Sequence, residues 1–257
     1  MRLLLIRHGD PDYVHDTLTP KGDREAEELA QLLAKEHIDC IYKSPRGRAQ
    51  KTASYTEKIT GLTGTTFEWL QEFPGRLDIH AAPWLEKAYP DWESHHDAGD
   101  RRIFWDMLPG ELMKRPELLD AEKWRHSELA GYGDIVNVYD HVTEEFDRLL
   151  AEWGYVRSGG LYHVEKANDK TLAFFCHFGL SCVLLSHLWQ CSPFMTWHML
   201  GMAPSSVTEL VTEERQPGIA VFRALRIGDI SHLRVCGDTP SFAGRFCETY
   251  EDASQRH

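Results

Sequence analysis

The sequence predicts an α/β protein: a three-layer α/β/α sandwich with a mostly parallel central sheet and a largely helical insertion. Two apolar runs, 3–6 and 171–176, lack polar alternation and indicate strands buried on both faces, as in a parallel sheet. Segments with amphipathic helical spacing lie between the predicted strands, which is the alternation that α/β folds require. Residues 79–133 interrupt this alternation and are therefore read as an insertion.

Composition fits one domain over 1–257, with 79–133 as an inserted lid or specificity segment. The chain is 42% hydrophobic and carries a net charge of −12, which argues against a nucleic-acid or anionic-membrane partner. We expect no signal peptide, because the apolar start is only four residues long before Arg7, and no apolar run reaches membrane-spanning length. Because its cysteines lack C-x-x-C spacing, we expect reduced thiols in a cytoplasmic protein. These cysteines are Cys40, Cys176, Cys182, Cys191, Cys236 and Cys247.

Helix-start signals and apolar spacing place the other elements. Thr19-Pro20 and Ser44-Pro45 each combine an N-cap residue with a first-turn proline, and Arg48 falls in the first turn of the second helix. Before the insertion we expect a helix over 20–36, a strand over 38–42, a helix ending near 59 and a strand over 65–70. After it we expect a helix over 134–153, a strand over 161–164 and a helix over 180–189. Two further strands are expected over 205–212 and 218–225.

The insertion offers three other candidate features, and for each the structural interpretation is favoured. Its tryptophans (Trp84, Trp92, Trp105 and Trp124) are expected to be packing anchors. Its cations could recognise a second anionic group, but a solvated helix face is the simpler interpretation; they are Arg101, Arg102, Lys114 and Arg115. The densest acidic and histidine cluster lacks His-x-x-x-His spacing, so no metal site is expected there; it comprises Asp91, Glu93, His95, His96 and Asp97.

Two histidines share one sequence context: an apolar strand, then His, any residue and Gly. These are His8 and His177. If their strands are parallel neighbours, both imidazoles reach the same sheet edge, where open α/β sheets bind ligands. Arg7 ends the first strand, and Arg48 lies at a helix start, where free N–H groups favour an anion. The pattern therefore predicts an anion site built from these four residues.

At these positions the sequence resembles the histidine phosphatase superfamily, which is also called phosphoglycerate-mutase-like. Arg7-His8-Gly9 is similar to its signature, and His177-Phe178-Gly179 resembles its second histidine turn, with Phe178 where glycine is usual. The runs 18–26 and 44–53 are similar to its Leu-Thr-x-x-Gly-x-x-Gln-Ala and Ser-x-x-x-Arg-Ala-x-x-Thr-Ala elements, with Glu25 in place of the glutamine. Glu72 follows Leu70 as the family's acidic residue does, and 205–208 is like a late strand of many members.

The resemblance implies a metal-independent phosphatase that needs no cofactor and acts on a small phosphomonoester. His8 would be the nucleophile and would form a phosphohistidine that water hydrolyses. Arg7 and Arg48 would bind the phosphoryl oxygens beside His8 and His177, and His177 would act best as a cation. Glu72 would be the general acid, a role that requires a raised pKa near its apolar neighbours.

Several alternatives stay open at this point. Glu68 competes with Glu72 for the role of acid. A mutase of the same family would need a closed, water-excluding pocket, and 79–133 shows no dedicated basic cage for one. A binding or scaffold protein on this fold would have lost catalysis, whereas every candidate charge and nucleophile is present. The sequence identifies neither the substrate nor the oligomeric state.

Overall fold

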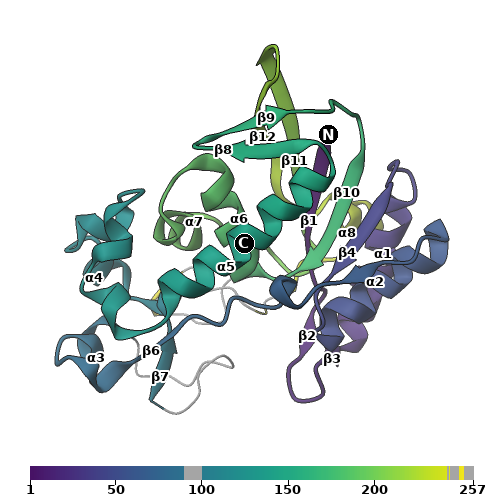
Figure 1. The fold of residues 1–257 in the computed structure, drawn as a ribbon. Helices are drawn as coiled ribbons and strands as arrows, with labels where there is room; N and C mark the ends of the chain where they lie inside the picture. The colour runs from purple at the N-terminus through teal and green to yellow at the C-terminus, as the bar shows by residue number, and fades with distance from the viewer. Residues whose placement is uncertain (90–99, 242, 244–248, 252–257) are drawn as a thin grey trace.

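The computed structural model describes residues 1–89, 100–241, 243 and 249–251, and an eight-stranded mixed sheet runs through them (Figure 1). One half, β5-β4-β10-β1, is parallel, and the pairings from β1 through β11, β12 and β9 to β8 are antiparallel. The predicted α/β fold class is confirmed. In spatial order the strands are β5 (Thr65–Thr66), β4 (Cys40–Lys43), β10 (Thr171–Cys176), β1 (Arg2–Arg7), β11 (Val207–Gln216), β12 (Ile219–Asp229), β9 (Leu161–Val164) and β8 (Tyr155–Ser158).

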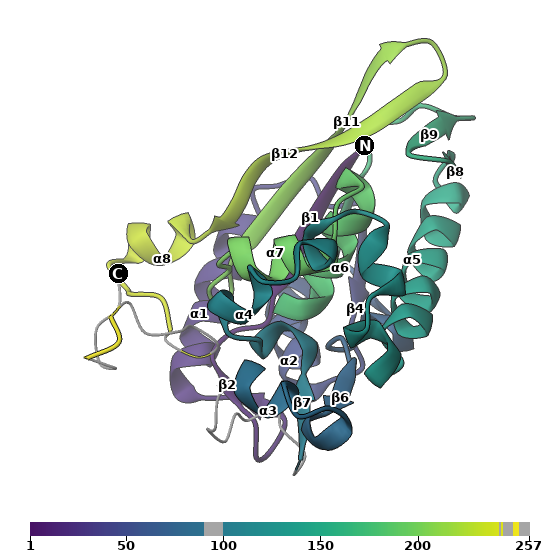
Figure 2. The ribbon, with the colours of Figure 1, turned by 90° about the vertical axis from the view of Figure 1, so that its left-hand side faces the viewer.

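Helices cover both faces of the sheet (Figures 1 and 2). Alternate residues of β1 pack in different apolar clusters, one on each face. Leu4 and Ile6 pack in one apolar cluster with Leu29 of α1, whereas Leu3 and Leu5 belong to a larger cluster on the side of α5 and α6. The three-layer arrangement therefore follows from an apolar strand with two buried faces. The main helices are α1 (Pro20–Leu33), α2 (Gly47–Thr60), α5 (Ile135–Glu152), α6 (Phe178–Trp189), α7 (Pro193–Met199) and α8 (Ser231–Cys236).

The two predicted helix starts differ in outcome. The Thr19 side chain accepts a hydrogen bond from the Gly22 N–H and caps α1, as predicted. The expectation for Ser44-Pro45 is wrong, because α2 begins at Gly47 after a non-capping Arg46. The Ser44 hydroxyl instead accepts from the Arg46 N–H and lies 2.8 Å from His177 Nε2. It therefore belongs to the histidine site.

Two further differences concern short strands. The strand expected over 65–70 stops at Thr66, since β5 pairs only with Tyr42 and Lys43 at the sheet's edge. Trp69 and Leu70 then turn into the core within a 3₁₀ helix, Glu68–Leu70. The sequence also did not predict β8, which forms a hairpin with β9 around Gly159 at φ 59°. Positive φ favours glycine, so this turn needed it.

The described part of 79–133 consists of short helical turns and one strand. Its first and last residues lie close together, because β6 (Arg76–Asp78) pairs with β7 (Arg101–Ile103) and Leu77 forms a bridge to Gly133. The pairing of β7 was not expected, since its sequence has no apolar alternation. The helical turns are Ile79–Ala81, α3 (Leu85–Ala88), Phe104–Asp106, α4 (Pro109–Leu112), Pro116–Leu119, Lys123–His126 and Leu129–Tyr132.

None of the helices in the described ranges combines the length and the apolar character needed to cross a bilayer. The cysteines within those ranges are free thiols, and Cys247 lies outside them. The cluster around His95 and His96 likewise lies outside the described residues.

Candidate active site

The two predicted histidines meet at one edge of the sheet. β1 and β10 are adjacent and parallel, with Arg7 opposite Cys176, so His8 and His177 leave the sheet side by side. Their ring centroids are 5.1 Å apart, and the residues are 2% and 0% exposed. The Ser205 N–H from the segment before β11 donates to the His8 carbonyl at 2.9 Å. The backbone of neighbouring strands thus fixes where His8 stands.

Hydrogen bonds define which nitrogen of His8 faces the site. Its Nδ1 lies 2.8 Å from the Gly9 carbonyl oxygen. Because a carbonyl only accepts, the proton belongs on Nδ1. Nε2 is then left with a lone pair, and it accepts a long hydrogen bond of 3.3 Å from Arg48 Nε. His8 therefore presents an unprotonated Nε2 toward the cationic side of the site, as a nucleophile requires.

Arg48 reaches the site from the first turn of α2 and contacts both histidines. Its Nη2 lies 3.3 Å from His177 Nδ1, and its Nη1 donates to Asp16 Oδ1 at 2.6 Å. Asp16 also accepts from the Gly47 N–H at 2.8 Å. Burial alone would raise the pKa of Asp16, but the Gly47 N–H and the Arg48 charge together lower it. A carboxylate therefore orients the guanidinium beside the imidazoles.

His177 is neutral in this arrangement. Burial first, and then the neighbouring His8 ring and the positive charges of Arg48 and Arg7, hold the pKa of His177 well below its usual value. Since Arg48 donates toward Nδ1, Nε2 carries the proton and donates to the Ser44 hydroxyl. That His177 would act best as a cation stays a prediction. The ring still offers an N–H donor at Nε2.

Arg7 is the second guanidinium of the site and is 4% exposed. It donates to two main-chain oxygens, those of Met202 at 2.5 Å and Ala243 at 3.3 Å, and its Nε has no hydrogen-bond partner among the described residues. Its guanidinium carbon lies 5.8 Å from the centroid of the Phe178 ring, on the turn after His177. Arg7 is therefore a buried cation held by neutral acceptors, without a carboxylate in salt-bridge contact among the described residues.

Glu72 also reaches this edge, and Glu68 does not. Glu72 Oε1 accepts from the Phe73 N–H at 2.9 Å and from the Leu180 N–H at 3.1 Å. Burial raises the pKa of Glu72, even though these N–H groups and the charges of Arg48 and Arg7 oppose the shift. Glu68 is exposed on its 3₁₀ helix. The structure thus brings Glu72 together with the predicted histidines and arginines.

Two residues of the site, Tyr13 and Asp16, were not predicted from the sequence. Tyr13, in the loop after His8, is hydrogen-bonded to Arg7, and its ring centroid lies 5.4 Å from the Arg48 guanidinium carbon. Asp16, the partner of Arg48, adopts a left-handed φ of 47°. Both lie in a loop without periodicity, so only an aromatic and an acid soon after the first histidine could have drawn attention to them.

Two candidate cations of the insertion, Lys114 and Arg115, make contacts within the insertion. Lys114 and Arg115 pair with Glu111, and the Arg115 guanidinium stacks on Trp84 at 3.6 Å. Trp124 is buried against Tyr139 and Phe194, as expected for a packing anchor; Trp92 lies outside the described residues. No cluster of three or more potential metal ligands occurs in the described ranges.

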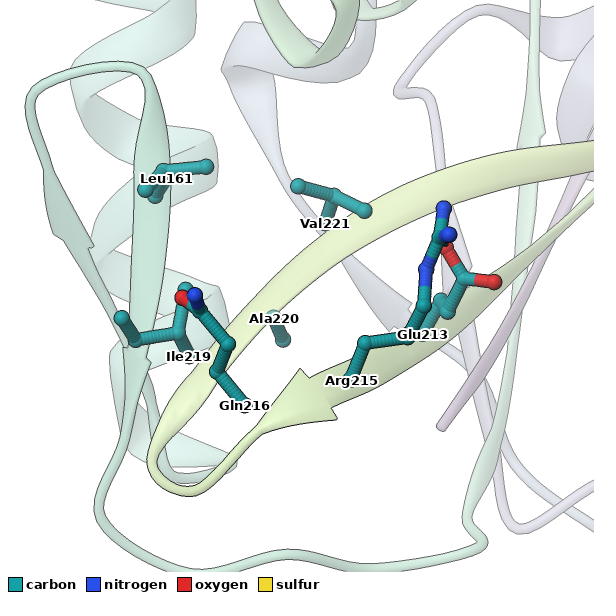
Figure 3. A pocket seen from close by; sticks show the side chains of 7 residues that line it. All are labelled: Leu161, Glu213, Arg215, Gln216, Ile219, Ala220 and Val221. Atoms are coloured by element: carbon teal, nitrogen blue, oxygen red, sulfur yellow. Dashed lines mark ion pairs between the residues drawn. The ribbon is translucent and has the colours of Figure 1, made fainter.

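A surface hollow of about 450 Å³ lies elsewhere, beside the turn between β11 and β12 (Figure 3). Since β11 runs antiparallel to β1, this turn is at the end of the sheet opposite His8. None of the predicted site residues lines it. Its lining residues are Leu161, Glu213, Arg215, Gln216, Ile219, Ala220 and Val221.

Comparison with known proteins gives the following likenesses. Residues 3–115 match the histidine phosphatase superfamily (branch 1). A Hydrogenobacter thermophilus protein, provisionally named phosphoserine phosphatase 2, is 29% identical over 116 residues, which are 42% of this chain and 47% of that protein. The match thus spans about half of this curated relative.

Two solved structures share the fold over most of the chain. A mycobacterial glucosyl-3-phosphoglycerate phosphatase with inorganic phosphate is 20% identical, with a TM-score of 0.56 over 90% of this chain and 98% of its own. An Entamoeba histolytica phosphoserine phosphatase with phosphoserine is also 20% identical, with a TM-score of 0.54 over 90% and 98%. The match over 3–115 includes Arg7, His8, Arg48 and Glu72, so the part of the chain that carries these residues is similar to the histidine phosphatase superfamily.

Proposed function

We propose that this protein is a phosphomonoesterase that works through a phosphohistidine on His8 and needs no metal ion. The observation that carries the proposal is the unprotonated Nε2 of His8 beside the guanidinium of Arg48 and the ring of His177. Arg7 and Tyr13 complete the same edge of the sheet. A small phosphorylated substrate fits the names of the similar proteins, which act on phosphoserine and on glucosyl-3-phosphoglycerate.

The reaction would proceed in two transfers. Nε2 of His8 attacks phosphorus in line as the ester P–O bond breaks, and the arginines stabilise charge on the equatorial oxygens. Glu72 gives its proton to the departing oxygen, as a carboxyl with a raised pKa can. Water then attacks the phosphohistidine, with Glu72 as the base that regains the proton. The P–N bond breaks and His8 is restored.

The catalytic test measures hydrolysis of p-nitrophenyl phosphate by the purified chain in the presence of a chelator. We expect turnover by the wild type and a loss of at least 1,000-fold in His8→Ala, on the scale seen when a covalent nucleophile is removed. His126→Ala, which changes an exposed histidine, is the matched control and should be unaffected. Equal rates in His8→Ala and the wild type would overturn the nucleophile. Loss of wild-type activity with the chelator would overturn the metal-free claim.

A second experiment separates a phosphatase from a mutase and from a scaffold protein. Rapid quenching should trap acid-labile phosphate on His8, and a panel including phosphoserine and 3-phosphoglycerate should yield free phosphate. Transfer of label to a second hydroxyl of the substrate, without release of phosphate, would favour a mutase. Absence of turnover on the whole panel would favour a binding protein.

A further inference from the structure

Trp105, from the inserted segment, lies near the candidate acid, Glu72. Gly179, on the turn after His177, marks the contact. A Cβ added to Gly179 would lie 2.5 Å from Trp105 Cη2 and 2.9 Å from Glu72 Oε1. The edge of the indole and the carboxyl oxygen therefore both lie close to the backbone of Gly179. Residues 104–106, a turn within 79–133, thus reach the active-site edge of the sheet.

Two other aromatic rings hold the indole in place. Trp105 is 7% exposed, and its ring centroid lies 5.5 Å from that of Trp197 and 6.5 Å from that of Phe73. Trp197 Nε1 donates to the Gly179 carbonyl at 3.0 Å. This aromatic cluster of Phe73, Trp105 and Trp197 therefore packs around Gly179. The indole of Trp105 cannot change its orientation without displacing the rings of Phe73 and Trp197.

Each polar group described around Glu72 either stabilises its ionised form or has no net effect on its ionisation. The cations Arg7 of β1 and Arg48 of α2 and the N–H groups of Phe73 and Leu180 stabilise the negative form. The other titratable groups that interact with Glu72 are Tyr13, Cys176 and Cys182, and burial raises the pKa of all three. Among the described residues, exclusion of water is therefore what opposes ionisation of Glu72, and apolar surface must supply it.

We propose that Trp105 is a positioning residue for Glu72: its ring keeps water from the carboxyl group, which can then donate its proton to the departing oxygen. The proposal rests on the function proposed above. Under this proposal the inserted segment 79–133 contributes to proton transfer, in addition to any contribution to substrate specificity. The step balances as described there, since Glu72 loses its proton to the leaving alkoxide and recovers one from the attacking water.

The test compares two esters that differ in their need for a proton. p-Nitrophenolate leaves readily as an anion, whereas the alkoxide of glycerol phosphate must be protonated. In Trp105→Gln we expect kcat for glycerol phosphate to fall about 10- to 100-fold, and that for p-nitrophenyl phosphate to fall less than about threefold. The alkaline limb of the pH profile for the alkyl ester should move to lower pH, because a hydrated Glu72 ionises earlier.

Two variants separate this role from damage to the fold. Trp105→Phe keeps an apolar ring and should recover most of the activity on the alkyl ester. Trp84→Gln changes a partly exposed tryptophan of the same segment and should leave both rates unchanged. Equal losses on the two esters, or an alkaline limb that does not move, would overturn the role of Trp105. Failure of the proposed function is distinct, because the wild type would then turn over neither ester through His8.

Discussion

Arg48 is held by a carboxylate before any anion reaches it. Asp16 accepts from both the Arg48 side chain and the Gly47 backbone, although its own side chain is 42% exposed. A pair whose carboxylate is open to water adds little stability, because water screens it. Its value lies in orientation, since a fixed guanidinium loses less entropy when it binds a phosphoryl group. Asp16 is therefore expected to matter more for turnover than for folding.

Asp16→Asn tests this expectation. Asparagine tolerates the left-handed φ of 47° and can still accept from Gly47, but it removes the charge opposite Arg48. We expect KM to rise about three- to tenfold and the melting temperature to change little. Steady-state kinetics and a thermal melt measure the two effects. A large loss of stability with unchanged KM would contradict an orienting role.

Glu25 is a buried carboxyl whose ionisation state should appear in stability. It is 0% exposed, its Oε2 accepts from the Asp10 N–H at 2.8 Å, and burial raises its pKa to about 7. In the unfolded chain it ionises near its ordinary value of 4.5. Between these pH values the folded protein binds more protons than the unfolded chain. Its contribution to stability is therefore lost progressively as the pH rises from about 4.5 to 7.

Glu25→Gln should remove this dependence while keeping an acceptor for Asp10. The variant should melt about 2–6 °C above the wild type at pH 8, and the difference should shrink toward pH 5. Thermal melts across this pH range provide the measurement. A wild type whose stability does not fall between pH 5 and pH 8 relative to the variant would contradict the argument.

At the scale of elements, helix α1 and the loop after His8 pack backbone against backbone. A Cβ on Gly22 would lie 2.2 Å from the Asp10 carbonyl oxygen, and one on Gly9 would lie 2.8 Å from the Gly22 carbonyl oxygen. Neither contact can yield by a side-chain rotation, because the opposing atoms are main chain. The glycines therefore allow α1 to support the turn that aims His8.

Gly22→Ala should separate these elements. We expect a loss of about 1–3 kcal/mol in the free energy of unfolding, measured in urea, together with a lower kcat/KM from the displaced His8 turn. Gly110→Ala is the control, since a Cβ there meets open space and alanine favours the helix. If the two variants proved equally stable, the close approach at Gly22 would not matter.

The sequence predicted the parts of the site that end regular elements. His8, His177 and Arg48 follow apolar strands or begin a helix, so their positions could be read from periodicity and then from parallel pairing. Tyr13 and Asp16 could not, because their loop has no repeating pattern. Trp105 could be expected to pack, but not against Glu72, since turns of three or four residues carry no periodicity. The early end of β5 reflects its position at the sheet's edge, which propensity does not reveal.

On the scale of the whole molecule, an acidic chain surrounds a buried cationic site. The net charge is −12, yet Arg7 and Arg48 are 4% and 8% exposed, and among the described residues Arg7 is hydrogen-bonded to two main-chain oxygens and to Tyr13, all of them neutral. Buried charge without full compensation costs stability. An anion bound in this site should therefore stabilise the folded state more than an anion bound to lysines on the exposed surface would.

Inorganic phosphate is the simplest probe of this linkage. At about one hundred times its Kd it should raise the melting temperature by about 5–10 °C. Arg48→Gln should abolish most of this increase, whereas Arg215→Gln, which changes an exposed arginine by the distant hollow, should keep it. An equal increase in all three proteins would place the bound anion elsewhere.

The adjacent ends of the inserted segment have a consequence for protein engineering. Because β6 pairs with β7 and Leu77 bridges to Gly133, the segment leaves and rejoins the α/β body at neighbouring points. Chimaeras of related chains could be joined there with little strain on the host sheet. A transplanted segment would nevertheless have to bring its own ring to the place of Trp105. A graft without one would accept a new substrate yet hydrolyse only esters with activated leaving groups.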